Sequence, residues 1–236
     1  MSEIQIGQVT EAWAKNQGLT VQYYKEINST NAVAKTEAFS QQALENEFVL
    51  YVTDSQTQGR GRFDRTWSTP QKGAALISSW SFQMTEMPQP TITALVGLAL
   101  FNAAKITWPF LNWSLKAPND LLIDDKKVAG LLIETVSQGD EYRCIVGLGL
   151  NVLAFPAEIP QATSLLKNLS AETPLLGEDW IHFLERFFFE LSLVIPVAHE
   201  PLNSTQVAQI IYALNENPNL TEKFESASDL NEELWR

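Results

Sequence analysis

Six apolar stretches of the chain have the length and composition of β-strands. Two of them, Phe48 to Thr53 and Tyr142 to Val152, are rich in the β-branched and aromatic residues that favour strands. The polar corner at residues 124–127 separates two further stretches and predicts a hairpin. The predicted strands cover residues 21–24, 48–53, 74–82, 121–123, 128–134 and 142–152.

Four other segments have the apolar spacing or the end signals of helices. Asn28, Ser29 and Thr30 offer N-caps before residues 32–38, and Gly177-Glu178-Asp179 resembles a capping start before residues 178–194. Residues 91–105 and 204–215 repeat apolar positions at helical spacing. We therefore predict an α+β fold, with a mixed, mostly antiparallel sheet of six or seven strands flanked by helices. Neither Rossmann alternation nor an internal repeat is visible.

Composition narrows the class of protein. The 236 residues are 45% hydrophobic, enough for one good core or two small domains. No apolar run reaches the 18 residues that a membrane helix requires, and the first residues lack a basic segment followed by an apolar one. Cys144 is the single cysteine and lies in an apolar run, which predicts a buried structural thiol and a cytoplasmic protein.

The net charge of −12 argues against general nucleic-acid binding, but the charge is uneven. Residues 1–150 hold 12 basic against 15 acidic side chains, whereas residues 151–236 hold 4 against 13. Positive charge is thus concentrated in the part of the chain that carries the motifs. The acidic last third is most simply a solvated surface.

Residues 59–70 alternate glycine with arginine, in the order Gly59, Arg60, Gly61, Arg62, and Arg65 and Trp67 follow. Glycines let the backbone approach a ligand closely, and arginine forks suit phosphate or carboxylate oxygens. An exposed arginine-rich turn explains the same residues equally well. If the segment is a binding loop, we expect it to be mobile when empty and ordered over an anion.

Two later stretches complete a pattern. Residues 116–134 read KAPNDLLIDDKKVAGLLIE, and residues 146–152 read VGLGLNV. Together with residues 59–70 and Ser29-Thr30-Asn31, in this order and at this spacing, they resemble the catalytic domain of biotin protein ligases over roughly residues 20 to 195. The resemblance implies a fold similar to class II aminoacyl-tRNA synthetases, shared by biotin and lipoate ligases. It implies an enzyme that forms biotinyl-5′-AMP from biotin and ATP with Mg²⁺, then transfers biotin to a lysine of a biotin carboxyl carrier protein.

The resemblance also implies roles for individual residues. Lys127 would be the catalytic lysine, assisted by Arg60 and Arg62. Biotin would be bound by Ser29, Thr30, Asn31, Gln56, Gly59, Arg60, Gly61, Arg62, Lys127 and Gly130. ATP would be bound by Arg62, Arg65, Trp67, Lys116, Asn119, Asp120 and Asn151, with Asp120 also a magnesium ligand.

Simpler explanations exist for several of these residues. From spacing alone, Lys127 is an exposed lysine at a hairpin corner beside Lys126. Ser29 and its neighbours are explained by helix capping, and Gln56 by a surface loop. The order of the motifs favours the functional roles.

The chain also departs from the family pattern. Ala117 stands where tryptophan is common, and Trp113 or Trp67 could fill the space. Residues 1–20 are too few for the helix-turn-helix domain of some members, so we expect no operator binding. We expect a catalytic domain over residues 1–200, then a C-terminal helix and acidic tail over 201–236 without the small β-barrel of many members.

Three rival functions stay open. A lipoate ligase or octanoyltransferase shares the lysine but usually lacks the glycine–arginine loop with Trp67. A nucleic-acid-binding module would use the three arginines and Trp67, against which Asp64 and the net charge count. A protein that binds biotin or its adenylate without transferring it is the third.

Overall fold

The computed structural model describes residues 5–63, 65–69 and 71–230, and its centre is a seven-stranded sheet. The strand order is β1-β2-β3-β7-β6-β5-β4, and β1 and β2 are the one parallel pair among these strands. The prediction of a mixed, mostly antiparallel sheet in an α+β fold is confirmed. The strands are β1 Val21–Tyr24, β2 Phe48–Thr53, β3 Ala75–Met84, β4 Trp113–Lys116, β5 Asp120–Ile123, β6 Lys126–Gln138 and β7 Glu141–Asn151.

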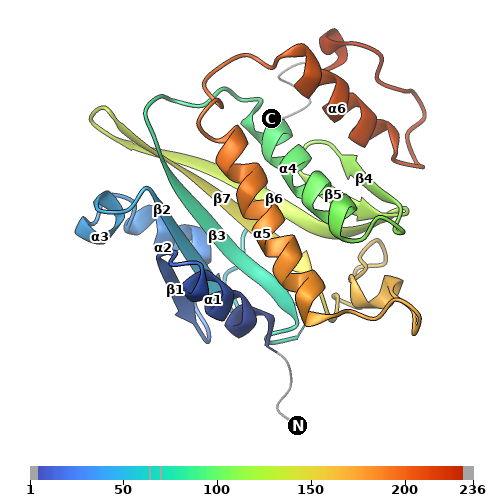
Figure 1. The fold of residues 1–236 in the computed structure, drawn as a ribbon, viewed down its shortest axis with the longest axis horizontal. Coiled ribbons are helices and arrows are strands. Elements are labelled where there is room, and N and C mark those ends of the chain that lie inside the picture. The colour runs from blue at the N-terminus through green and yellow to red at the C-terminus, as the bar shows by residue number, and fades with distance from the viewer. Residues whose placement is uncertain (1–4, 64, 70, 231–236) are drawn as a thin grey trace.

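Helices cover both faces of this sheet, and α4 and α5 cross its near face in Figure 1. The helices are α1 Ile6–Asn16, α2 Thr30–Thr36, α3 Gln41–Leu44, α4 Ile92–Thr107, α5 Gly177–Val194 and α6 Ser204–Asn215, with short 3₁₀ turns at Leu166–Asn168 and Ala227–Asp229. The four predicted helices are confirmed, but α1 and α3 were not predicted. The capping start expected for α5 was wrong: its N-cap is Leu176, which makes no side-chain cap.

The two faces of the sheet carry different side chains, because successive residues of a strand point to opposite sides. On the face covered by α1, α4 and α5, Trp80 packs against Trp13 at 6.0 Å and edge-on against Phe187 at 5.1 Å between ring centroids. On the opposite face, only a small apolar cluster with α2 is present among the described residues, and β7 there offers Gly147 and Gly149. One face is therefore the main core, and the other has room for a ligand.

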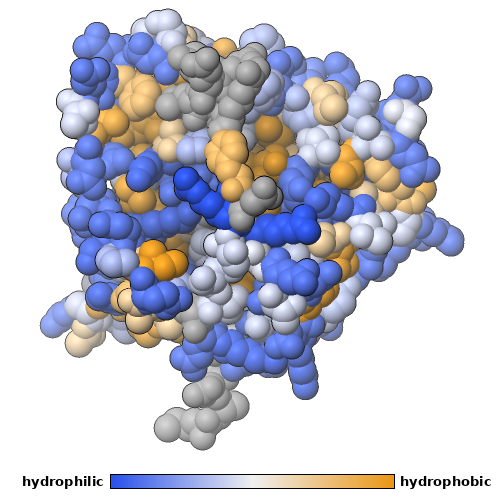
Figure 2. Space-filling view, turned by 180° about the vertical axis from the view of Figure 1, so that it is seen from behind, coloured by the Kyte–Doolittle hydropathy of each residue, from blue (hydrophilic) through white to orange (hydrophobic). Residues whose placement is uncertain are grey.

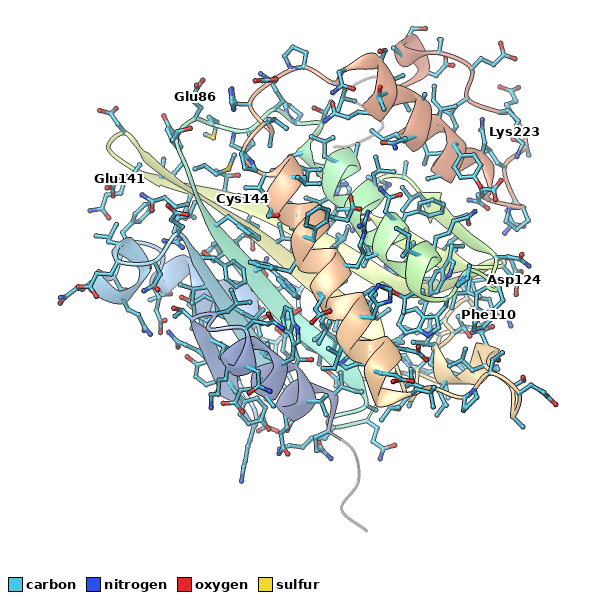
Figure 3. The ribbon with its side chains drawn as sticks, viewed as in Figure 1. Glu86, Phe110, Asp124, Glu141, Cys144 and Lys223 are labelled. Atoms are coloured by element: carbon cyan, nitrogen blue, oxygen red, sulfur yellow. The ribbon has the colours of Figure 1, made fainter. Side chains whose placement is uncertain are left out.

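Cys144 lies on β7 inside the sheet, between strands β3 and β6 (Figure 3). Its side chain is fully buried, and burial raises the pKa of the thiol to about 12. The prediction of a buried structural thiol is confirmed. Figure 3 also shows Asp124 and Glu141 near the turns at the two ends of β6.

The C-terminal segment shares the main core instead of forming a separate one. Ile210 and Leu214 of α6 are buried in it, and α6 packs against α4 and β4. The expected acidic tail follows α6, and its residues 231–236 lie outside the described residues. No described helix is both long enough and apolar enough to span a membrane.

The packing of α5 gives a prediction about stability. Phe187→Ala should lower the free energy of unfolding by about 3–5 kcal/mol, because it opens a cavity between Trp80 and the parallel ring of Phe183. The matched control, Phe189→Ala, alters a ring that is 48% exposed and should cost less than about 1 kcal/mol. Urea unfolding measures both, and equal losses would contradict this account of the core.

Candidate active site

A small cavity lies on the sheet face opposite α5, where strongly hydrophilic residues cross the centre of the surface in Figure 2. Its free volume is about 50 Å³, little more than one or two water molecules need. The lining residues come from α2, β3, β6, β7 and the loops before β3 and β5. They are Ser29, Thr30, Asn31, Gln56, Arg60, Gly61, Trp67, Ile77, Ser78, Asn119, Lys127, Gly130, Leu131, Leu132, Gly147, Leu148 and Gly149.

The start of α2 supplies one end of the cavity. Ser29 is the N-cap, and its Oγ accepts a hydrogen bond from the backbone N–H of Ala32 at 3.4 Å. Gln56 is brought to this turn by a parallel bridge to Ile27, and its Oε1 accepts from the backbone N–H of Thr30 at 2.7 Å. The capping role and the position in a pocket therefore coexist, because a helix start exposes free N–H groups.

Asn31 lines the cavity, but its amide nitrogen is already used by the framework. Nδ2 donates to the Leu132 carbonyl at 3.1 Å and to Oε2 of Glu134 at 2.8 Å. Ser79, which lies beneath it on β3, was not predicted as a site residue, and neither were Glu134 and its ion-pair partner Lys35. The one sequence signal for Glu134 was its place as the last residue of the lysine motif.

Three glycines of β6 and β7 make the space. A Cβ on Gly149 would lie 2.5 Å from the Trp67 indole, and a Cβ on Gly130 would lie 3.0 Å from Lys127 Nζ. A Cβ on Gly147 would overlap the Asn31 amide. Gly130 and Gly149 are cross-strand partners, so their missing side chains open one continuous floor. Trp67 lies on that floor and occupies most of it.

Lys127 reaches the cavity because β6 contains a bulge. The register jumps from Leu121↔Ala129 to Leu122↔Lys127, so Val128 is the extra residue. Ala129 faces the main core, and regular alternation would send Lys127 there as well. The bulge instead buries Val128 beside Ala129 and turns Lys127 to the cavity.

The Lys127 ammonium lies 2.6 Å from Oδ1 of Asp120 and 5.9 Å from the centre of the Trp67 ring. The backbone on both sides of the side chain is fixed, because Lys127 N–H donates to the Gln161 carbonyl and its carbonyl accepts from Thr163. Asp120, which the resemblance implied as an ATP and magnesium ligand, is thus the ion-pair partner of Lys127. The Lys127 ammonium is therefore fixed at the end of the cavity by its ion pair and its backbone, and Lys127 is not a mobile lysine at the hairpin turn.

The glycine–arginine loop is a tight hairpin over the cavity mouth. Gly61 N–H donates to the Arg65 carbonyl at 2.7 Å, and Phe63 has a positive φ of 53° with its ring 74% exposed. Asp64, which was weighed against nucleic-acid binding, lies outside the described residues. The loop places Arg60 in the cavity, Arg62 in an adjoining hollow and Arg65 on its outer side.

Within the arginine loop, Arg62 carries a charge that is affected by burial. Its Nη1 is buried and has no hydrogen-bond partner among the described residues. Burial lowers the pKa of the guanidinium, against the opposing effect of Asp120. A desolvated cation gains most from an anion placed beside it. The arginine loop therefore fits a phosphate or carboxylate group.

The remaining predicted residues are spread around this centre. Asn119 donates to the Leu131 carbonyl at 2.6 Å, and Asn151 donates to the Thr163 carbonyl at 3.0 Å while its Oδ1 stays buried without a described partner. Gly59 lies outside the cavity and supports Trp67. Lys116 borders a second hollow of about 450 Å³ that Lys127 also lines.

Ala117 opens onto the same second hollow, between β4 and the end of α6. Leu214 and Phe224 line it, whereas Trp113 is buried in the main core. The space expected for tryptophan is thus bordered by the C-terminal segment and filled by neither Trp113 nor Trp67. The described residues contain no group of three acidic, histidine or cysteine side chains placed for a metal.

The fold and this site define a class of protein: an α+β domain with a glycine-floored pocket, a fixed lysine and an arginine loop. The sequence profile described as the biotin/lipoate A/B protein ligase family matches residues 23–151. The chain belongs to this family.

Individual relatives agree. The Bacillus subtilis bifunctional ligase/repressor BirA is 34% identical over 175 residues, covering 70% of this chain and 50% of that protein. The Mycobacterium tuberculosis biotin–[acetyl-CoA-carboxylase] ligase is 33% identical over 147 residues, 60% of this chain and 53% of that one. The chain spans about half the length of these relatives. The Aquifex aeolicus biotin protein ligase, solved with biotin and ATP, aligns with a TM-score of 0.59 at 28% identity over 82% of this chain and 79% of that one.

The glycine floor gives a prediction. Gly147→Ala should lower the free energy of unfolding by about 1–3 kcal/mol, because the new methyl meets an Asn31 amide that three hydrogen bonds hold in place. In the control Gly97→Ala, the methyl meets only Leu115 at 3.7 Å inside helix α4, so stability should rise by about 0.5–1 kcal/mol. Chemical denaturation compares the two; a stable Gly147→Ala would show that Asn31 is loosely held.

Proposed function

We propose that this protein is an ATP-dependent biotin protein ligase that forms biotinyl-5′-AMP and transfers biotin to a lysine of a biotin carboxyl carrier protein. The observation that carries the proposal is the position of Lys127, which the bulge of β6 turns into the pocket that the arginine loop also lines. Support comes from relatives named as biotin ligases and from the Aquifex aeolicus enzyme solved with biotin and ATP.

In this proposal the ring system of biotin enters the pocket beside α2. Gln56 and Thr30 meet the polar ureido group, and the Ser29 hydroxyl, which accepts from Ala32, keeps its own proton for a ligand carbonyl. The rings lie on the floor of Gly130, and the valerate chain leads the carboxylate to Lys127 and Arg60.

The chemistry then requires two anions to meet. A biotin carboxylate oxygen attacks the α-phosphorus of ATP, the bond to pyrophosphate breaks, and a mixed anhydride forms. Lys127 reduces the repulsion between carboxylate and phosphate, and Arg62 binds phosphate oxygens. Arg65, which lies on the outer side of the loop, would reach a phosphate once the loop has moved. In the second step the carrier amine attacks the acyl carbon, AMP leaves, and the amine loses a proton.

The nucleotide would contact Trp67, Asn119 and Asn151, whose buried Oδ1 is free to accept a hydrogen bond. Lys116 would contribute from the second hollow. Mg²⁺ would reach the site with ATP, with Asp120 as its one protein carboxylate, and would neutralise phosphate charge. A donor set of one carboxylate plus phosphates is ordinary for magnesium.

We further propose residues 1–200 as the catalytic unit and the C-terminal helix α6 as its brace. Leu214 joins the main core and also borders the hollow beside Ala117. A lone buried Cys144 suits a reducing compartment, so we place the reaction in the cytoplasm.

Adenylate formation tests the proposed function. With ATP and Mg²⁺, the protein should convert biotin, and not lipoate, into an acyl-adenylate detectable by mass spectrometry. Lys127→Ala should slow this step about a hundredfold or more, because an ammonium between two anions is lost. Lys126→Ala is the matched control: it removes the same charge one residue away and should leave the rate nearly unchanged. Lipoyl-adenylate alone, or equal rates for the two variants, would refute the proposal.

The cavity is also too small for biotin while Trp67 lies on its floor, so the arginine loop has to move for the ligand to bind. Once bound, two anions should hold the loop through Arg60 and Arg62. Trypsin cleavage after Arg60, Arg62 or Arg65 should therefore slow several-fold with biotin and ATP but not with lipoate and ATP. An equal cleavage rate with and without biotin would mean that the loop does not close over the ligand.

A further inference from the structure

A chain of polar side chains connects the ion pair of Lys35 and Glu134 to the pocket. Lys35 donates to Oε1 of Glu134 at 2.7 Å, and Asn31 donates to Oε2 at 2.8 Å. The Asn31 carbonyl oxygen lies 2.5 Å from the Ser79 hydroxyl, which lies 2.8 Å from the Thr30 hydroxyl. Thr30 Oγ1 in turn lies 3.2 Å from Oε1 of Gln56.

Counting protons fixes the direction of this chain. The carboxylate of Glu134 can only accept, so it takes one N–H of Asn31, and the Leu132 carbonyl takes the other. Oδ1 of Asn31 therefore faces Ser79 and must accept its one proton. The Ser79 oxygen must then accept the proton of Thr30.

Thr30 consequently has no proton left for Gln56. The 3.2 Å gap between their oxygens is the longest of the three oxygen–oxygen distances, as expected for the one that holds no hydrogen. Both oxygens belong to residues that line the pocket. Gln56 Oε1 already accepts the backbone N–H of Thr30 at 2.7 Å, so each of these two oxygens has one further lone pair to offer to a ligand N–H.

We propose that Glu134 is a positioning residue that selects a cyclic urea through this relay: its charge fixes Asn31, Ser79 and Thr30 so that Thr30 and Gln56 present two acceptors to one ureido N–H. The inference rests on the proposed function, because it concerns how the same pocket distinguishes biotin. Glu134 need not touch the ligand to do this. Its partner Lys35 forms an ion pair with the other carboxylate oxygen.

An uncharged isostere should reverse the chain. In Glu134→Gln the single carbonyl oxygen is drawn to the Lys35 ammonium, so the new NH₂ faces Asn31. Asn31 then flips to accept from this NH₂, at the cost of its hydrogen bond to the Leu132 carbonyl. The flipped amide offers Nδ2 to Ser79 and frees Thr30 to donate to Gln56. The two acceptors are no longer both available, and the preference for a ligand N–H is lost.

The experiment compares biotin with its two cyclic carbamate isosteres, in each of which one ureido N–H is replaced by oxygen. Wild type should bind one isostere at least about tenfold more weakly than biotin in calorimetry, because the hydrogen bonds from one ureido N–H to the Thr30 and Gln56 oxygens are lost. In Glu134→Gln this ratio should fall to within about threefold. KM for biotin should rise about tenfold with kcat little changed, because the ureido ring is remote from the reacting carboxylate.

Three further variants separate positioning from stability. Ser79→Ala interrupts the relay and should also remove the preference. Lys35→Met breaks the same ion pair but leaves the acceptor, so the preference should remain. Glu190→Gln is the matched control, because Glu190 of α5 also binds a cation, Arg186, and an asparagine amide, that of Asn102 on α4. This variant should change stability alone.

The outcomes are distinct. If the wild-type protein binds no biotin, both the proposed function and the role of Glu134 are refuted. If wild type discriminates and Glu134→Gln and Ser79→Ala discriminate equally well, the relay is wrong while the function stands. A loss of preference in Glu190→Gln as large as in Glu134→Gln would show a general effect of stability. If Glu134→Gln does not fold, the comparison of Ser79→Ala with Lys35→Met decides.

Discussion

The extra residue Val128 in strand β6 is the constraint on which the site depends. Successive side chains of a regular strand point to opposite faces of the sheet. A lysine therefore points away from the core only if it lies an odd number of positions from a core-facing residue. By inserting one residue, the bulge lets Val128 and Ala129 both enter the core while Lys127 turns to the pocket. A regular strand with the same composition would have to bury an ammonium among apolar side chains, at a cost of several kcal/mol.

The two faces of the sheet differ in how much side-chain volume they carry. Its helix-covered face is filled by large rings such as Trp80 and Phe187, whereas the other face is emptied by Gly147 and Gly149. The core can therefore hold the strands rigidly, and the pocket floor is backbone that cannot change rotamer. Asn31 fits against this floor and is fixed by it, which makes a reliable hydrogen-bond relay possible.

Electrostatics complete the site within an acidic chain. A net charge of −12 repels polyanions at long range, yet Arg60, Arg62 and Lys127 gather around one cavity and its mouth. The buried Arg62 guanidinium costs free energy unless an anion pairs with it. Asp120 pairs with the Lys127 ammonium on one side only. The arrangement suits small anions brought into a pocket better than an extended phosphate backbone.

The sequence by itself determined the elements with a local signal. Apolar runs rich in β-branched and aromatic residues defined strands such as β2 Phe48–Thr53, and helical spacing defined α6 Ser204–Asn215. Motif order indicated Lys127 and the arginine loop. Helix α1 was missed although Ile6, Thr10, Trp13 and Ala14 are buried at helical spacing, because no side-chain cap marks its start at Gln5. Only the tertiary structure decided that Ser79 and Glu134 belong to the site, that Arg65 faces outwards, and that Asn31 serves the framework. These facts depend on cross-strand register and on long-range hydrogen bonds. Asn31 and Ser79 are separated by 48 positions in the sequence, and Asn31 and Glu134 by 103, so no local pattern encodes the contacts.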